Sequence, residues 1–120
     1  MLRFDKHAQG ARWRARKAAR ERAEHDMVAT VRAQVVEREG GLCRTRLDGA
    51  AFPWCTGGGT DLHEESGVRG MGGRSVSDRP LTTANSILTC RACHMAHHNG
   101  QIHIEIENAD LLFGVWYRRL

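Results

Sequence analysis

The first part of the chain carries the hydrophobic pattern of an α-helix. Residues 11–39 are rich in Ala, Arg, Glu and Val, contain neither Pro nor Gly, and place Val28, Val31 and Val35 at helical spacing. Glycines follow at positions 40–41, and glycine forms the left-handed C-terminal cap of a helix at little cost. The pattern predicts a long helix whose second half packs its valines on the rest of the protein. Its Arg-rich first half has no apolar stripe and is expected to project.

Shorter patterns follow this helix. Residues 43–77 are mostly Gly and polar residues, which predicts loop over most of the segment. Short runs predict one strand near residues 60–64 and a second near 87–89, joined as a hairpin by a long connection. Residues 91–98 suit a short helix that ends at the Asn-Gly pair 99–100.

The C-terminal segment alternates between apolar and polar positions. Ile102, Ile104 and Ile106 are separated by His and Glu, which is the period of a half-buried strand, and residues 111–118 are expected to pair back onto it. The predicted fold class is therefore α+β, with a long N-terminal helix, a strand-loop-strand-helix unit and a short C-terminal hairpin. A chain of 120 residues is expected to form one compact unit overall.

The expected organisation is a basic helical arm, residues 1–41, attached to a body, residues 42–120. The body has few large apolar side chains, so its core alone is expected to stabilise it only marginally. No apolar run has the length of a signal peptide or of the roughly 18 residues that a membrane span needs, so a cytoplasmic protein without membrane contact is expected.

The formal net charge of +4 is unevenly distributed. Residues 1–22 hold eight Lys or Arg against two acids, a balance of +6, and residues 23–120 hold ten Arg against twelve acids, a balance of −2. This asymmetry favours a polyanionic partner, although a solvated basic helix that only aids solubility has the same composition. The candidate phosphate-binding residues of the arm are Arg12, Arg14, Arg16, Lys17 and Arg20; Arg69 and Arg74, which flank glycines in the body, are secondary candidates.

The four cysteines are interpreted as metal ligands, because cytosolic thiols are kept reduced. Cys90 and Cys93 have the C-x2-C spacing by which one tight turn directs two thiolates at one ion. Cys43 and Cys55 would complete a tetrahedral site without an open position, which is typical of structural zinc. Such sites bind with about 10 to 16 kcal/mol, enough to offset a thin core. The alternative is four unrelated buried thiols.

A second group of residues could form a catalytic site. His94 and His98 lie four residues apart on the predicted short helix, so both imidazoles face the same way and can share one metal ion. His97 is expected to point elsewhere. His63, in the first predicted strand, and Asn85, just before the second, could meet the two helical histidines in one cleft.

In this order the residues resemble those of the HNH endonucleases with the ββα-metal fold, especially the small forms of bacteriophages and actinobacteria. The resembling stretch runs from Cys43 to His98 and reads C…C-TGGGT-DLHE…RGMGG…N-SILT-C-RA-C-H-MAH-H. It covers about half of the chain and includes the step of nine residues from Asn85 to His94 and of four more to His98.

The chain departs from the family pattern in two places. The first cysteine pair of the family usually reads C-x2-C, so the longer spacing here implies a looped-out finger. Many members carry Asp-His or His-His in the strand, metal ligand first and general base second, where this chain has His63-Glu64. In that register His63 binds the metal and Glu64 is the base. By chemistry alone, histidine suits the base at neutral pH and Asp61, on the same strand face, suits the ligand; both assignments stay open.

The resemblance implies a DNA endonuclease that hydrolyses phosphodiester bonds with one Mg²⁺, Mn²⁺ or Ni²⁺ ion. His94, His98 and a strand residue would hold the ion, and the Asn85 amide would hold the loop that bears the base. Nothing in the chain predicts a base-reading element, so weak sequence specificity is expected. Genes of such proteins often accompany phage packaging genes, which makes a terminase or packaging complex a candidate partner.

Two other functions compete with this one. A non-catalytic zinc-finger DNA-binding or packaging accessory protein would need the second metal site to have decayed, yet His63, Asn85, His94 and His98 are all retained. A structural zinc module that binds protein would leave the basic arm unexplained.

Overall fold

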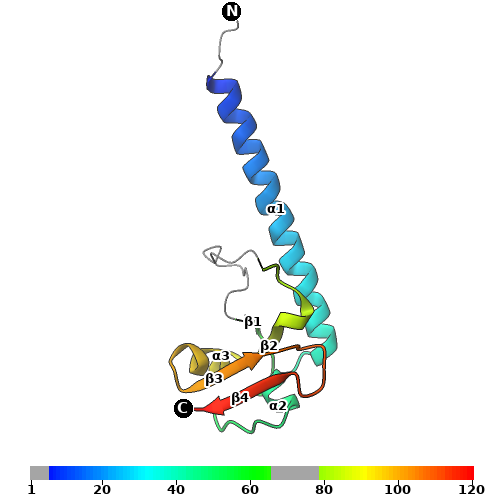
Figure 1. The fold of residues 1–120 in the computed structure, drawn as a ribbon, viewed down its shortest axis with the longest axis vertical. Coiled ribbons are helices and arrows are strands. Elements are labelled where there is room, and N and C mark those ends of the chain that lie inside the picture. The colour runs from blue at the N-terminus through cyan, green and yellow to red at the C-terminus, as the bar shows by residue number, and fades with distance from the viewer. Residues whose placement is uncertain (1–5, 66–78) are drawn as a thin grey trace, which may run out of the picture.

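The computed structural model of the chain describes residues 6–65 and 79–120. Figure 1 shows an α+β body at one end of a long helix. The elements, in chain order, are helix α1 Lys6–Glu39, helix α2 Arg44–Leu47, strand β1 Asp61–Glu64, the short 3-10 helix η1 Thr83–Asn85, strand β2 Ser86–Thr89, helix α3 Arg91–His98, strand β3 Ile102–Ile106 and strand β4 Val115–Arg119.

Helix α1 has 34 residues and is therefore about 51 Å long. It ends at Glu39, as predicted, because Gly40 and Gly41 take positive φ angles of 63° and 73°. The Gly41 N–H then donates to the carbonyl of Val36 at 3.0 Å, which closes the last turn. The helix begins before the predicted start, since a single glycine in this segment does not interrupt it. None of the helices within residues 6–65 and 79–120 is long and apolar enough to cross a membrane.

The two halves of α1 have different environments, as the valine spacing predicted. Val28, Val31 and Val35 are buried against Leu81 and Leu88. Side chains of residues 11–27 are exposed or half-buried, and this half of the helix extends away from the body (Figure 1). The second half of α1 thus shares a hydrophobic core with the body.

Strands β1 and β2 form the predicted antiparallel hairpin, and α3 follows β2 directly. His63 pairs with Ile87, and Asp61 pairs with Thr89. Strand β2 is buried along its length because Leu88 packs on the α1 valines while Ile87 joins the core beneath β3. The predicted order of strand, long connection, strand and helix is confirmed, and it sets β1 against α3.

Residues 43–59 form a finger that is closed at its base by antiparallel pairing. The Cys43 N–H donates to the Gly57 carbonyl at 2.9 Å, and the Gly59 N–H donates to the Gly41 carbonyl at 2.9 Å. Gly59 has no room for a side chain, because a Cβ there would lie 2.3 Å from the Leu88 side chain. The finger brings Cys43 and Cys55 to the same end of the body despite the eleven residues between them.

Helix α2 corrects the prediction of mostly loop for this region. Its single turn begins directly after Cys43, and its first residue, Arg44, is 6% exposed. A helix this short is not stable from propensity alone, so tertiary contacts hold it. Those contacts are absent from any local pattern, which is why the sequence predicted loop.

A buried ionic network supplies these contacts. Arg44 Nη1 lies 3.0 Å from Glu39 Oε1, and Arg44 Nε lies 2.9 Å from Asp48 Oδ2. Arg44 Nη1 also donates to the Ala109 carbonyl at 2.8 Å, and the Tyr117 hydroxyl donates to Asp48 Oδ2 at 2.7 Å. Charge-assisted hydrogen bonds therefore join the end of α1, the finger and the C-terminal hairpin.

Strands β3 and β4 form the second two-stranded sheet, as the C-terminal pattern predicted. Ile102 pairs with Arg119 and Ile106 with Val115. The isoleucines of β3 are buried and the residues between them are exposed, which confirms the period-2 assignment. Strand β4 begins at Val115, later than predicted, because the residues before it form the turn.

Candidate metal centre and histidine cluster

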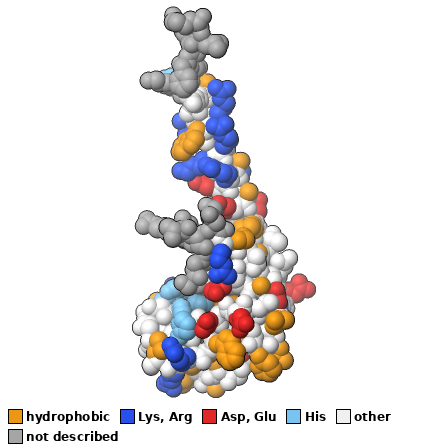
Figure 2. Space-filling model, in the orientation of Figure 1, with side chains coloured by type: hydrophobic (Ala, Val, Ile, Leu, Met, Phe, Trp, Pro, Cys, Tyr) orange, Lys and Arg blue, Asp and Glu red, His pale blue; other side chains and the backbone are white. Residues whose placement is uncertain are grey.

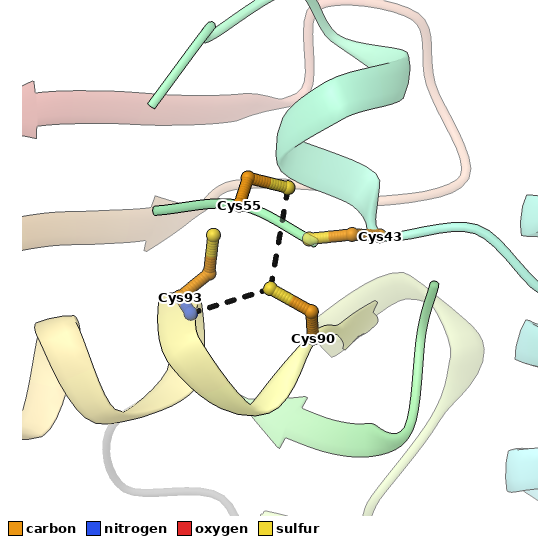
Figure 3. A group of neighbouring side chains, drawn as sticks. All are labelled: Cys43, Cys55, Cys90 and Cys93. Atoms are coloured by element: carbon orange, nitrogen blue, oxygen red, sulfur yellow. Dashed lines mark hydrogen bonds between the residues drawn. The ribbon is translucent and has the colours of Figure 1, made fainter. Parts of the chain in front are cut away.

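The four cysteines come together from three separate segments of the chain. Cys43 precedes α2, Cys55 lies on the return of the finger, and Cys90 and Cys93 belong to the first turn of α3 (Figure 3). Their sulfur atoms all lie within 4.8 Å of one another, and all four thiols are free. Cys55 is partly exposed, whereas the other three are buried.

The sulfur positions suit a tetrahedral ion. Four sulfurs bound to zinc at about 2.3 Å are separated by about 3.8 Å. The Cys55 and Cys90 sulfurs lie 4.0 Å apart, and the Cys93 N–H donates to Cys90 Sγ at 3.4 Å, which holds the tight turn that the C-x2-C spacing predicted. The four cysteines are thus positioned to hold a metal ion such as zinc, as the sequence predicted.

The electrostatics of the cluster also favour a bound cation. Burial raises the pKa of the Cys43 and Cys93 thiols. Burial acts in the same direction on Cys90, but hydrogen bonds from the Thr56 and Cys93 backbone outweigh it and bring the pKa of Cys90 to about 6. One thiolate is therefore present at neutral pH, and a cation would compensate the cost of forming the others.

Thr45 contacts three of the four cysteines, a feature that the sequence analysis missed. Its side chain is fully buried, and Oγ1 lies 3.0 Å from Cys43 Sγ, 3.4 Å from Cys93 Sγ and 3.6 Å from Cys55 Sγ. A hydroxyl among thiolates can donate its proton to one of them and so stabilise negative charge on sulfur. The only sequence signal for this role is the position of Thr45 two residues after a candidate ligand.

Three histidines meet where β1 crosses α3. His63 is 4% exposed, and its Nδ1 lies 3.2 Å from Nδ1 of His94. Nε2 of His94 lies 3.1 Å from Nε2 of His98. His94 therefore contacts its two neighbours through opposite ring nitrogens, and one ring would have to turn for all three to bind a single ion.

His97 belongs to this cluster too, so the prediction that it points elsewhere is wrong. Its ring centroid lies 4.7 Å from that of His63, in an edge-to-face arrangement. Its Nδ1 accepts a hydrogen bond from the Ile104 N–H at 3.2 Å, which leaves the proton of the neutral ring on Nε2. Positions three and four residues apart are both neighbours on a helix surface, so α3 can present His94, His97 and His98 to the same strand.

Burial determines the protonation of the cluster. Burial, and to a smaller extent the positive charges that His97 and His94 can carry, together lower the pKa of His63 from 6.5 to about 3. Burial also lowers the pKa of His94 and raises that of Glu64, the residue next to His63 on β1. At neutral pH His63 therefore keeps a free ring lone pair, which either a metal ligand or a base needs.

The other predicted residues of this site lie around the histidines. Asp61 is on the same strand face as His63, and its carboxylate contacts Arg91 at 3.3 Å. Asn85 is buried and holds the preceding loop, because its Oδ1 accepts from the Thr82 N–H at 2.9 Å and its Nδ2 donates to the Pro80 carbonyl at 2.9 Å. The Asn85 carbonyl also accepts from the backbone N–H that follows Glu64, which ties this loop to the end of β1.

The predicted phosphate-binding residues of the arm are solvent-exposed. Figure 2 shows Lys and Arg side chains along the projecting half of α1 and a histidine patch on the body in the same view. Lys17 forms a long ion pair of 3.9 Å with Glu21 and lies 5.4 Å from the centre of the Trp13 ring. Arg69 and Arg74 lie outside the described residues. The exposed members are Arg12, Arg14, Arg16, Lys17 and Arg20.

Comparison of the chain with models of protein families, with curated proteins and with solved structures found no match. The function is therefore inferred from the residues of the cysteine and histidine clusters. Within residues 6–65 and 79–120, the cysteines form a closed set of sulfur donors. The histidines of β1 and α3 form a separate set of nitrogen donors, with the carboxylates of Asp61 and Glu64 close enough to interact with His94 and His98. A closed thiolate site is typical of structure, and imidazole beside carboxylate is typical of catalysis or metal binding.

Proposed function

We propose that this chain is a metal-dependent DNA endonuclease of the HNH type, with one structural zinc ion in the cysteine cluster and one catalytic divalent ion at the histidine cluster. The observation that carries the proposal is the meeting of His63 on β1 with His94 and His98 on α3, at nitrogen separations of 3.2 and 3.1 Å. The buried Asn85 before β2 supports it, because it secures the loop next to His63.

The histidine cluster has a donor set that suits a divalent ion. Two nitrogens bound to one ion at about 2.1 Å lie about 3.0 to 3.4 Å apart, depending on the geometry, and each of the two separations falls in this range. They involve opposite ring nitrogens of His94, so one ring must turn before a single ion can bind all three histidines. We assign the ion to His94 and His98 together with His63. Imidazole accepts Zn²⁺, Ni²⁺ and Mn²⁺ at least as readily as Mg²⁺. A bound ion would stabilise the charge that develops on the scissile phosphate and on the leaving 3′ oxygen.

We assign the general base to Glu64. His63 is almost fully buried among three other histidines, an environment that suits a ligand, whereas Glu64 is only partly buried and open to water. The raised pKa of Glu64 brings its carboxylate closer to the strength that a base needs near neutral pH. Glu64 takes a proton from water, the water oxygen attacks phosphorus, the bond to the 3′ oxygen breaks, and a solvent water molecule gives that oxygen its proton. The products carry a 5′ phosphate and a 3′ hydroxyl.

The cysteine cluster has a different task in this proposal. Three of its thiols are buried, and the body around them has few large apolar side chains. A zinc ion there would join the finger to α3 and so hold β1 and β2 beside the histidines. Its contribution is stability, since four thiolates leave no open position for substrate.

Supercoiled-plasmid nicking tests the proposal. Zinc-loaded protein is incubated with plasmid and Mg²⁺, Mn²⁺ or Ni²⁺, beside His63→Ala, His94→Ala and Glu64→Gln variants whose folding is checked by circular dichroism. Nicking should require the added ion and fall at least about 100-fold in each variant, as for loss of a group that acts in the transition state. The control is His25→Ala, because His25 is exposed on α1 away from the cluster.

Retention of plasmid without nicking under every ion would contradict the enzymatic proposal. It would favour the non-catalytic zinc-finger DNA-binding or packaging accessory protein instead. Equal nicking by the wild type and the His94→Ala variant would place the chemistry elsewhere in the molecule or in a contaminant. A phage terminase or packaging complex is a candidate partner of the proposed nuclease.

A further inference from the structure

Helix α1 is packed on the body through its C-terminal half, and its N-terminal half projects from the body. Val28, Val31 and Val35 anchor it in the core. Arg38 adds polar contacts, because its guanidinium donates to the Thr83 carbonyl at 2.6 Å and to the Ser86 carbonyl at 2.8 Å. The direction of the projecting half is therefore set by packing against β2 and η1.

The projecting half carries a regular row of positive charge. Arg12, Arg16 and Arg20 follow one another at intervals of four residues, so they share one face and are spaced by about 6 Å along the helix. All three are exposed, and no ion pair joins any of them to a residue in 6–65 or 79–120. Like charges at this spacing destabilise an isolated helix. A row that costs stability in the free protein suggests a polyanionic partner.

Arg32 marks the point where α1 passes the histidine-bearing strand. Its Nη2 donates to the Thr60 carbonyl at 2.7 Å, and Thr60 directly precedes β1. Along the helix axis, Arg20 lies twelve residues and Arg12 twenty residues from Arg32 toward the N-terminus, and the two lie about 120° and 160° around the helix from it. At 1.5 Å per residue these steps are about 18 and 30 Å, which correspond to about 5 and 9 base pairs of duplex.

We propose that α1 is a one-sided contact arm for duplex DNA, which binds phosphates about 5 to 9 base pairs from the site of cleavage and on one side of it only. This inference rests on the proposed function and adds the class and extent of its substrate. A straight helix with evenly spaced arginines suits a partner whose phosphates keep fixed positions along the row. Duplex DNA is such a partner, because its persistence length of about 500 Å makes it stiff over far more than 30 Å. A single strand has no fixed path along such a row.

The positions of cleavage test this inference directly. A 40-base-pair duplex, labelled at each end in turn, is cut by zinc-loaded protein with added divalent ion. On each strand, cuts should be depleted within about 9 base pairs of one end and should approach the other end closely. The triple variant Arg12→Gln, Arg16→Gln, Arg20→Gln should lose this asymmetry. The Arg118→Gln, Arg119→Gln variant, which removes exposed charge from β4, should keep it. A symmetric profile in the wild type would overturn the proposal.

Binding without added divalent ion tests the arm separately from catalysis. Affinity is measured for duplexes of 8, 12, 16 and 24 base pairs at several salt concentrations. The wild type should gain affinity up to a length that spans body and arm, and the triple variant should lose most of this gain. Its slope of log K against log salt should fall by about 1 for each arginine removed.

The two experiments distinguish the arm from the nuclease. Length-dependent binding without any cleavage would support the proposal that α1 contacts DNA and would contradict the proposal that the chain is a nuclease. Cleavage with a symmetric profile, together with length-independent binding, would support the nuclease and contradict the role of α1 as a contact arm. Tighter binding of single-stranded DNA or of RNA than of duplex would overturn the assignment of the partner.

Discussion

Thr45 shows how one side chain can connect a metal site to the rest of a fold. Its hydroxyl lies 3.0 to 3.6 Å from three cysteine sulfurs, and it occupies the one-turn helix that the Arg44 network holds in place. Groups that donate hydrogen bonds to metal ligands typically change metal affinity by about 10- to 100-fold. Thr45 can therefore tune the cluster without binding the ion.

The substitution Thr45→Val tests this role, because valine keeps the shape and removes the hydroxyl. Zinc affinity, measured by competition with a chromophoric chelator, should fall about tenfold or more. Thr45→Ser keeps the hydroxyl and should recover most of the affinity, although the lost methyl lowers stability. Equal zinc affinity of the valine and wild-type proteins would show that the hydroxyl only fills space.

His63 predicts a pH dependence of stability. Because its pKa is about 3 in the folded protein and 6.5 otherwise, the unfolded chain binds more protons between these values. Stability should therefore be fully present above pH 6.5 and decrease as the pH falls toward 3. Between pH 7.5 and pH 4.5, protonation of this one group in the unfolded chain should lower the free energy of unfolding by about 3 kcal/mol.

Denaturant unfolding at pH 7.5 and 4.5 without an added second metal measures this effect. The His63→Gln variant should lose less stability than the wild type between the two pH values. The exposed histidine of β3 supplies a matched control, since His103→Gln should keep the full difference. Protonation of the cysteines affects all three proteins alike, so the difference between variants isolates His63. Parallel pH profiles for the wild type and His63→Gln would refute the assignment.

At the scale of elements, the buried network around Arg44 joins three parts of the chain that carry no mutual sequence pattern. Arg44 contacts Glu39 of α1, Asp48 of the finger and the carbonyl of Ala109 before β4. Removal of one partner from such a network leaves the other charges buried and uncompensated. Removal of one residue of the network should therefore lower the free energy of unfolding by more than the intact network contributes to it.

The variant Arg44→Ala should lower the free energy of unfolding by about 2 to 3 kcal/mol, because Glu39 is only 4% exposed and would keep its charge with Arg38 as its remaining ion-pair partner. Urea unfolding followed by circular dichroism measures this loss. Arg46→Ala, two residues further along the same short helix, removes an exposed guanidinium and should change stability by less than about 1 kcal/mol. A similar loss in both variants would mean that α2 as a whole, and not the network, is responsible.

At the scale of the whole molecule, the body depends on two small cores and the cysteine cluster. One core lies under β3 and the other joins α1 to β2, and the cysteine cluster lies between the finger and α3. A metal ion that binds the folded state alone adds its binding free energy to folding. A metal ion bound by the cysteines would hold together the elements that position the histidine cluster.

Removal of the metal should therefore unfold the body. With a strong chelator, the cooperative thermal transition of the zinc-loaded protein should broaden or disappear, and added Zn²⁺ should restore it. Circular dichroism should retain some helical signal in the metal-free state, while near-ultraviolet signals from Trp54 and Trp116 should be lost. An unchanged transition in the presence of chelator would show that the cysteines are ordinary core residues.

Local patterns predicted most of the fold but only part of the candidate site. The valine spacing and the glycine pair defined the packed half and the end of α1, and the isoleucine alternation defined β3. The C-x2-C spacing predicted the turn that begins α3, and the four-cysteine cluster was predicted from this spacing together with the expectation of reduced thiols. These signals succeed because helix and strand periods and tight turns depend on neighbours in the chain.

Other features depend on which segments meet in space. The sequence could not show that His97 contacts His63, that Thr45 lies among the sulfurs, or that Arg44 stabilises a helix of one turn. Each involves at least one contact between residues 34 to 65 positions apart, which no local period encodes.

The sequence by itself thus determined which residues are available as ligands, where α1 ends and which side chains face the core, because these depend on side-chain chemistry and short-range backbone geometry. The tertiary structure alone decided that His97 joins the other histidines where β1 crosses α3, that Thr45 lies among the cysteine sulfurs, and that Arg44 holds a helix of one turn. Packing and buried charge networks set these long-range positions, and they act only once the chain has folded.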